Sequence, residues 1–230
     1  MENFLNNSVF FGVFLSLAAY GTGLFIKNKF RLANFNPLLI AIIIVIAFLK
    51  LAGIKYSMYN DGAKYISYLL TPATVCLAIP LYRQVSILKK NWKAVIAGVT
   101  TGVLSSMGSV LLMSMLFGIT HEHYVTLLPK SITTAIGMGV SEELGGITVI
   151  TVAVIIITGV IGNIIAVPAC KMFHITESVA KGIGLGSSAH AIGTVKAFEM
   201  GEMEGAMSSL SIAVSGLITV IMASLFASFY

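Results

Sequence analysis

Long apolar stretches without a charged residue recur along the chain, separated by short charged segments. Six such runs are present: Val9 to Ile26, Leu32 to Leu49, Tyr65 to Tyr82, Ala94 to Thr120, Leu144 to Cys170 and Gly205 to Tyr230. Each reaches the roughly 18 to 20 residues that a helix needs to cross a hydrocarbon core about 30 Å thick. The pattern predicts an all-α polytopic membrane protein with about six full membrane helices.

Two further segments are shorter and more polar. Ser131 to Ser141 and Gly182 to Val195 are rich in glycine, serine and threonine and are bounded by charged residues. Such segments can lie at membrane depth only where protein shields them or where they face a watery cavity. We therefore expect two short broken or re-entrant segments beside the six helices.

The composition agrees with repeated membrane crossing. Of 230 residues, 57% are hydrophobic and only 10% are charged, whereas an ordinary soluble chain has about 25% charged residues. The net charge of +5 comes from basic residues beside the apolar runs, which favours contact with the lipid bilayer over nucleic acid. Cys76 and Cys170 lack metal-ligand spacing, and we expect neither a metal site nor a cofactor.

Basic clusters between the runs predict the orientation. Positively charged loops favour the cytoplasm, which places both Lys27 to Arg31 and Arg83 to Lys93 inside. The N-terminus then lies outside a multi-pass inner or plasma membrane protein. Lys171 and Lys181 also favour the cytoplasm, which needs an odd number of crossings before them. A re-entrant Ser131 to Ser141 supplies that number, whereas a full crossing there would place Lys171 outside.

Prolines and glycines mark the expected helix breaks. Pro72, between Thr71 and Thr74, removes a backbone donor from the third run, and Pro80 does so again. Two later strings are typical of helix starts, with a proline or glycines followed by hydroxyl residues that can cap. They are Pro129-Lys130-Ser131-Ile132-Thr133-Thr134, with the break expected at Pro129, and Gly184-Leu185-Gly186-Ser187-Ser188-Ala189-His190, with the break expected at Gly186.

Paired helix starts with cationic side chains predict an anion site. Helix N-termini attract anions, and Lys130 and His190 add positive or titratable groups. A lysine at the bilayer centre costs about 2.5 to 3.5 kcal/mol on insertion scales, so its presence there favours a function. A small carboxylate is the expected ligand. The substrate-binding candidates are Thr71, Thr74, Lys130, Ser131, Thr133, Thr134, Ser187, Ser188, His190 and Thr194.

Each feature also has a purely structural interpretation. The prolines can be packing kinks, Lys130 can extend to the outer interface, and His190 can be an interior residue bonded to a backbone carbonyl. Glu142 and Glu143 can be a solvated loop end, although they are adjacent carboxylates beside a candidate re-entrant segment.

Proton coupling is the expected use of the histidine. His190 is the only histidine placed at membrane depth, so carboxylate binding is expected to tighten as pH falls from about 8 to 6. Glu142 and Glu143 are the next candidates for the coupling proton. Asp61 is the only aspartate, and the six runs contain no acidic residue, so a sodium cage of carboxylates is not expected.

The order of the segments indicates an internal repeat. An interrupted segment precedes a long helix twice, once at Tyr65 to Tyr82 and again at Gly182 to Val195. Corresponding interruptions in two halves are a sequence pointer to a transporter's binding site. We predict a single membrane domain over 1–230, with possible inverted-repeat halves 1–120 and 121–230.

Three ordered motifs resemble the CidB/LrgB family over essentially the whole chain. They are Leu70-Thr71-Pro72-Ala73-Thr74 through Ala78-Ile79-Pro80-Leu81-Tyr82, then Pro129 to Thr134, then Gly186-Ser187-Ser188-Ala189-His190-Ala191-Ile192-Gly193-Thr194. Members often carry a proline after the paired threonines, where this chain has Ala135. That departure affects the geometry expected for this break.

The resemblance implies two roles. Bacterial members are described as antiholin-like modulators of murein hydrolase activity and autolysis that act with a small CidA/LrgA-type membrane protein. Plastid relatives resemble glycolate/glycerate translocators, and some bacterial pairs are associated with pyruvate uptake. A tuned anion site favours a carboxylate transporter, in a homo-oligomer such as a dimer, over a holin-like pore. An enzyme is disfavoured because Ser187 and His190 lack a nucleophile-elbow context.

Overall fold

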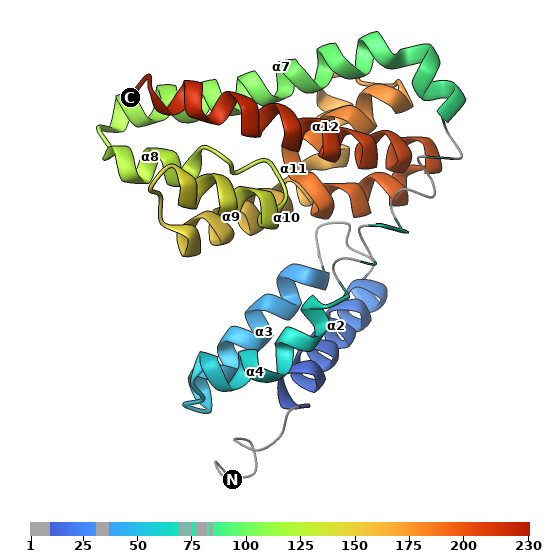
Figure 1. Ribbon diagram of the computed structural model, residues 1–230. Helices are drawn as coiled ribbons and strands as arrows, with labels where there is room; N and C mark the ends of the chain where they lie inside the picture. Colours follow the sequence, from blue (N-terminus) through green and yellow to red (C-terminus); the bar gives the residue numbers. More distant parts are fainter. Residues whose placement is uncertain (1–9, 31–36, 70–71, 73–74, 77–81, 83–84) are drawn as a thin grey trace. The chain divides into compact units, whose positions relative to one another are not determined.

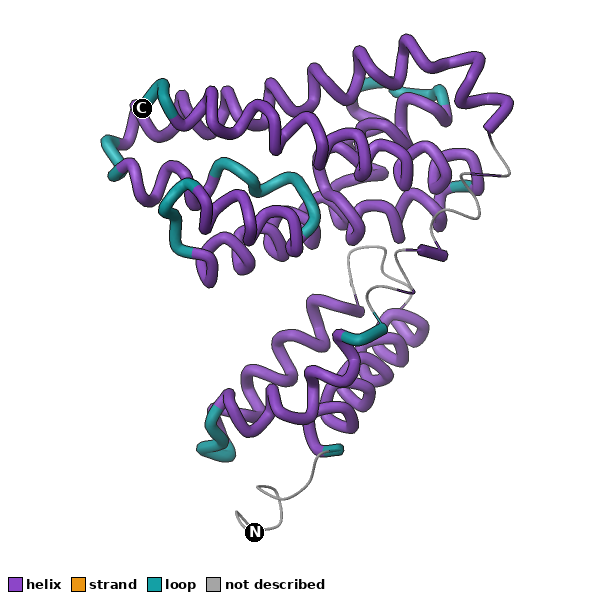
Figure 2. Tube along the Cα trace, viewed as in Figure 1, coloured by secondary structure: helices purple, strands orange, loops and turns teal. Residues whose placement is uncertain are grey.

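All regular structure in the described part of the chain is helical. The computed structural model describes residues 10–30, 37–69, 72, 75–76, 82 and 85–230, and every regular element among them is a helix (Figure 2). The expectation of an all-α polytopic membrane protein is confirmed. The chain forms two compact units, Met1–Cys76 and Leu77–Tyr230. The division into halves 1–120 and 121–230 stays a prediction.

The first unit packs three helices together (Figure 1). They are α2 (Phe11–Phe30), α3 (Pro37–Leu51) and α4 (Tyr56–Ser67). A Cβ on Gly12 would overlap the Tyr59 carbonyl oxygen, so the missing side chain lets α2 and α4 touch. The Ser16 and Tyr59 hydroxyl oxygens lie 2.8 Å apart across this contact.

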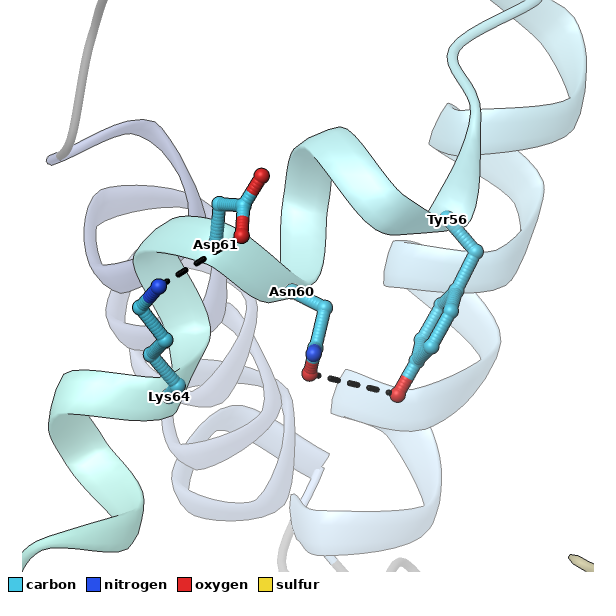
Figure 3. A network of polar contacts seen from close by, with 4 residues as sticks. All are labelled: Tyr56, Asn60, Asp61 and Lys64. Atoms are coloured by element: carbon cyan, nitrogen blue, oxygen red, sulfur yellow. Dashed lines mark hydrogen bonds and ion pairs between the residues drawn. The ribbon is translucent and has the colours of Figure 1, made fainter.

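Most of helix α4 lies outside the six predicted runs, because its sequence is polar on one side. Figure 3 shows its exposed pairs: Lys64 Nζ lies 3.5 Å from an Asp61 carboxylate oxygen, and the Tyr56 hydroxyl donates to Asn60 over 3.4 Å. The predicted run Tyr65 to Tyr82 begins in the last three residues of α4, and half of its residues lie outside the described part of the chain.

The second unit contains the long membrane helices. Its helices are α7 (Val85–Phe117), α8 (His121–Leu127), α9 (Thr134–Glu143), α10 (Thr148–Met172), α11 (Ser178–Met200) and α12 (Glu202–Ala227). Among the described residues, α7 from Lys89 onward, α10 and α12 are long and apolar enough to cross a membrane. They match the fourth, fifth and sixth predicted runs. α7 and α12 lie side by side in Figure 1, and the Tyr230 hydroxyl donates to the Ser114 carbonyl over 3.1 Å where they end.

Helices α8 and α9 form a short hairpin beside α7. The chain leaves α8, turns through residues 128–133, and returns through α9. Its open end is tied together around Thr126: the Ile147 amide donates to the Thr126 hydroxyl over 2.8 Å, and the Thr151 hydroxyl donates to the Thr126 carbonyl over 3.0 Å. The Ser131 to Ser141 segment is therefore the end of a turn plus the short helix α9, as expected for a broken segment, and its re-entrant topology stays a prediction.

Helix α11 reverses direction at its middle. His190 has φ 41° and ψ −140°, far from helical values. A Cβ on Gly193 would lie 2.9 Å from the Leu185 carbonyl oxygen, although eight residues of a straight helix span about 12 Å. α11 is therefore a helical hairpin, with one arm from Ser178 to Ala189 and a returning arm from Ala191 to Met200.

The two hairpins approach the middle of α7 from opposite ends. The α8–α9 hairpin starts beside the end of α7 at Phe117, and its Ser131 lies against Ser106. The first arm of α11 runs the other way, with Ile183 against Gly98 and Ser187 against Gly102. Gly102 and Ser106 are about one helical turn apart, so the two hairpins meet along the same stretch of α7.

Candidate functional site

A cavity of about 710 Å³ lies where the two hairpins meet α7 and α10. Its polar lining comes from four places in the chain: Thr101, Ser105 and Ser106 on α7, Lys130 and Ser131 in the α8–α9 turn, Thr158 on α10, and Ser187 and Ser188 on α11. Glycines at positions 98, 102, 162 and 184 and the apolar side chains of Ile161 and Ile165 complete the wall. The cavity size is in the range of small-molecule sites.

The cation of this cavity is Lys130, which two serines hold. Its Nζ donates to Ser106 Oγ over 3.1 Å and to Ser131 Oγ over 3.3 Å, and the two Oγ atoms lie 2.7 Å apart. The ion pairs of the described residues include Lys64 with Asp61 and Lys196 with Glu199, and within that part of the chain no carboxylate pairs with Lys130.

The position of Lys130 disfavours the alternative that its side chain simply extends to the membrane surface. Its partner Ser106 lies 11 residues before the end of α7, about 16 Å along the axis, and 13 residues after Lys93, about 20 Å. The ammonium is thus held beside the middle of the uncharged part of the helix. An unneutralised charge at that depth requires an anion or water.

Four of the predicted binding residues come together in this cavity, and the others do not. Lys130, Ser131, Ser187 and Ser188 line it. Thr133 and Thr134 begin α9 and do not line it, and Thr133 makes no side-chain cap. Thr71, Thr74 and Pro80 lie outside the described residues, and so do most neighbours of Pro72.

The predicted role of Ser187 and Ser188 as helix caps is wrong. Both lie inside the first arm of α11, where Ser187 Oγ donates to the Ile183 carbonyl over 2.8 Å and Ser188 Oγ to the Gly184 carbonyl over 2.6 Å. The break is at His190 and not at Gly186. Gly186 instead serves packing, because its Cβ would overlap the Ser208 carbonyl oxygen of α12.

Pro129 also differs from the expectation of a first-turn proline. It follows the end of α8 at Leu127 by two residues, and its carbonyl accepts the Ile132 amide in the turn over 3.3 Å. The helix that the string predicts begins later, at Thr134. Pro129 therefore ends one helix and shapes the turn that carries Lys130.

His190 anchors the α11 reversal. It is 3% exposed, and its Nε2 lies 2.8 Å from the Ile155 carbonyl oxygen of α10, to which it donates. Thr194 lies on the returning arm, donates to the His190 carbonyl over 3.0 Å, and contacts Ser208 Oγ at 2.7 Å. Neither residue lines the cavity. Glu142 and Glu143 are exposed at the end of α9 and do not line it either.

Sequence reasoning missed the serines and threonines of α7 and α10. The signal was present on α7, where Gly98, Thr101, Gly102, Ser105 and Ser106 recur at intervals of three and four residues. That spacing places them on one helix face. Small residues on such a face let a neighbouring helix approach, and their hydroxyls give a polar wall within an apolar helix.

The similarity to known proteins covers nearly the whole chain. A sequence model described as the LrgB-like family matches residues 16–229. The chain belongs to the LrgB-like family. Relatives include the proteins named antiholin-like protein LrgB from Bacillus mycoides (strain KBAB4), Bacillus cereus (strain B4264) and Bacillus anthracis (strain CDC 684 / NRRL 3495). Each is 38% identical over 221 residues, which is 96% of both chains. No solved structure matches this chain.

The anchoring bond of His190 gives a testable stability effect for this LrgB-like protein. His190→Ala removes the donor to the Ile155 carbonyl, and the free energy of unfolding is expected to fall by about 1 to 2 kcal/mol. His190→Gln retains an amide donor and should recover part of the loss. Thermal unfolding in detergent measures both, and equal melting temperatures for wild type and His190→Ala would contradict the anchoring role.

Proposed function

We propose that this protein transports small monocarboxylates, such as the 2-hydroxy and 2-oxo acids glycolate, glycerate and pyruvate, through the Lys130 cavity. The observation that carries this proposal is the unneutralised ammonium of Lys130, held by Ser106 and Ser131 at mid-depth of α7. A buried cation with hydroxyl neighbours favours a carboxylate, because charge-assisted hydrogen bonds are about twice as strong as neutral ones.

The hairpin architecture supports a transport cycle. Broken helices that meet near the midplane are typical of secondary transporters, in which one bundle moves around a fixed site. Here Ser131 and Ser187 come from hairpins that enter from opposite ends of α7. Each hairpin would form the barrier toward one side of the membrane. An inverted repeat would explain this arrangement, and it remains part of the proposal.

Partners and coupling complete the proposal. By analogy with its antiholin-like relatives, we propose that the protein acts in the plasma membrane with a small CidA/LrgA-type membrane protein, forms a homo-oligomer such as a dimer, and affects autolysis through carboxylate flux. Proton coupling through His190, Glu142 or Glu143 stays a prediction. Its test is the pH dependence of carboxylate affinity in wild type and His190→Gln, and equal profiles would exclude His190 as the coupling group.

An antiholin without a transport cycle is the second candidate. The names of the relatives at 38% identity favour it. An enzyme has less support, because the two side chains that a hydrolytic site would pair are directed to different carbonyls. Ser187 Oγ donates to Ile183 and His190 Nε2 to Ile155.

Direct binding to purified protein tests the proposal. A panel of glycolate, glycerate, pyruvate and acetate is titrated against the protein in detergent, with and without the small partner, while its melting temperature is recorded. Carboxylates that bind the folded state raise this temperature with increasing concentration. A rise for these acids and none for matched neutral alcohols is expected. No response to any carboxylate would contradict the proposal.

A further inference from the structure

The polar walls of the Lys130 cavity differ in hydrogen-bonding character. The wall formed by Lys130, Ser106 and Ser131 can donate hydrogen bonds to a ligand. Of the three N–H groups of Lys130, two point to the serine oxygens, and one serine hydrogen lies between the two Oγ atoms. One ammonium N–H and one serine O–H remain for a ligand. Two neighbouring donors match the two oxygens of a carboxylate.

The other wall, formed by Thr101, Ser187 and Ser188, can only accept hydrogen bonds from a ligand. Thr101, Ser187 and Ser188 each donate their only hydroxyl hydrogen to a carbonyl four residues earlier in their own helix, over 2.8, 2.8 and 2.6 Å. The oxygen of each hydroxyl keeps a lone pair for a ligand but has no hydrogen to give. Ser188 is exposed, whereas Ser187 is 4% exposed and packs against Gly102. Ser188 is therefore the most accessible acceptor.

The spacing of the two walls suits one small molecule. Ser187 lies against Gly102, and the donor Ser106 is four residues further along α7, about 6 Å. The remaining hydroxyls of the cavity, Ser105 and Thr158, make no hydrogen bond within the described part of the chain and can turn either way. Each can donate or accept, so neither defines a wall.

We propose that Ser188, supported by Ser187, is a specificity-determining residue that accepts a hydrogen bond from a ligand hydroxyl, so that the cavity prefers 2-hydroxy acids to 2-oxo acids. This inference rests on the proposed transport function. A 2-hydroxy acid presents a carboxylate to the donor wall and an O–H to the acceptor wall. A 2-oxo acid has a ketone oxygen at C2, which accepts hydrogen bonds but cannot donate one. The ketone oxygen and the Ser188 hydroxyl oxygen would then face each other as two acceptors.

Lactate and pyruvate test the preference, because they share one carbon skeleton and differ only in hydroxyl or ketone at C2. Purified protein in liposomes takes up labelled glycolate, and each unlabelled acid competes. Lactate is expected to compete roughly fivefold more strongly than pyruvate in wild type, which corresponds to one hydrogen bond. Ser188→Ala is expected to weaken competition by lactate and to leave competition by pyruvate unchanged or slightly stronger, because the ketone oxygen no longer faces the Ser188 oxygen. The ratio then comes close to one.

Ser209→Ala is the matched control, because Ser209 Oγ makes the same kind of bond to the Gly205 carbonyl over 2.9 Å and does not line the cavity. It should keep the wild-type ratio. Equal competition by lactate and pyruvate in wild type, or an equal loss of both in Ser188→Ala, would overturn the role of Ser188 and leave transport standing. Absence of glycolate uptake by wild type would overturn both proposals.

Discussion

Replacing Lys130 with alanine is expected to weaken carboxylate binding at least tenfold. The variant removes the ammonium that would bond the carboxylate, and a charge-assisted hydrogen bond contributes about 1.5 to 3 kcal/mol. Ser106 and Ser131 remain bonded to each other at 2.7 Å, so no buried polar group loses its last partner and the protein should fold. The measurement is the apparent affinity for glycolate and pyruvate in liposomes.

Two further variants isolate the role of the charge. Lys171→Ala removes an exposed lysine at the end of α10 and should leave the affinity unchanged. Lys130→Arg keeps the positive charge but needs more room beside the two serines, and it should bind better than Lys130→Ala. Normal affinity in Lys130→Ala, with a normal melting temperature, would place the anion site elsewhere.

Replacing Gly186 with alanine is expected to destabilise the second unit by about 3 kcal/mol. A Cβ there would overlap the Ser208 carbonyl oxygen and come within 2.8 Å of the Ser211 Cβ. Backbone atoms cannot yield as a flexible side chain does, so α11 and α12 would have to separate, and overpacking of this kind typically costs 1 to 3 kcal/mol or more. Thermal unfolding in detergent measures the effect.

Gly108→Ala gives the matched control on α7. Among the described residues, nothing lies within 4 Å of a Cβ at position 108, and alanine is favoured over glycine in a helix by about 1 kcal/mol. The control should therefore melt at or above the wild-type temperature. If Gly186→Ala and Gly108→Ala have the same melting temperature, the close packing of α11 on α12 is not needed for stability.

The long helices could be predicted from the sequence because one physical limit sets their length. Uncharged runs such as Ala94 to Thr120 and Leu144 to Cys170 are long enough to span the hydrocarbon core, and they form α7 and α10. The two short polar segments could be recognised for the opposite reason, since neither is long or apolar enough to cross. Each forms part of a helical hairpin.

The location of the α11 break could not be predicted from local preference. Glycine favours positive φ, so the break was expected near Gly186, yet the residue with φ 41° is His190. Tertiary contacts determine the position of the break. Gly186 must stay helical and in close contact with α12, whereas the His190 side chain is held by its hydrogen bond to the Ile155 carbonyl. Similarly, hydropathy averaged over α7 conceals its serine face, which becomes a cavity wall only when the hairpins pack beside it.

Solute selectivity in liposomes tests the central claim of a carboxylate transporter most directly. Purified protein is reconstituted, and uptake of labelled glycolate and pyruvate is measured against leakage of an unrelated trapped dye. The Lys130 cavity predicts saturable uptake of the acids, loss of this uptake in Lys130→Ala, and no dye release in either protein. Dye release that accompanies non-saturable passage of the acids, equally in wild type and Lys130→Ala, would contradict the transporter and favour a pore.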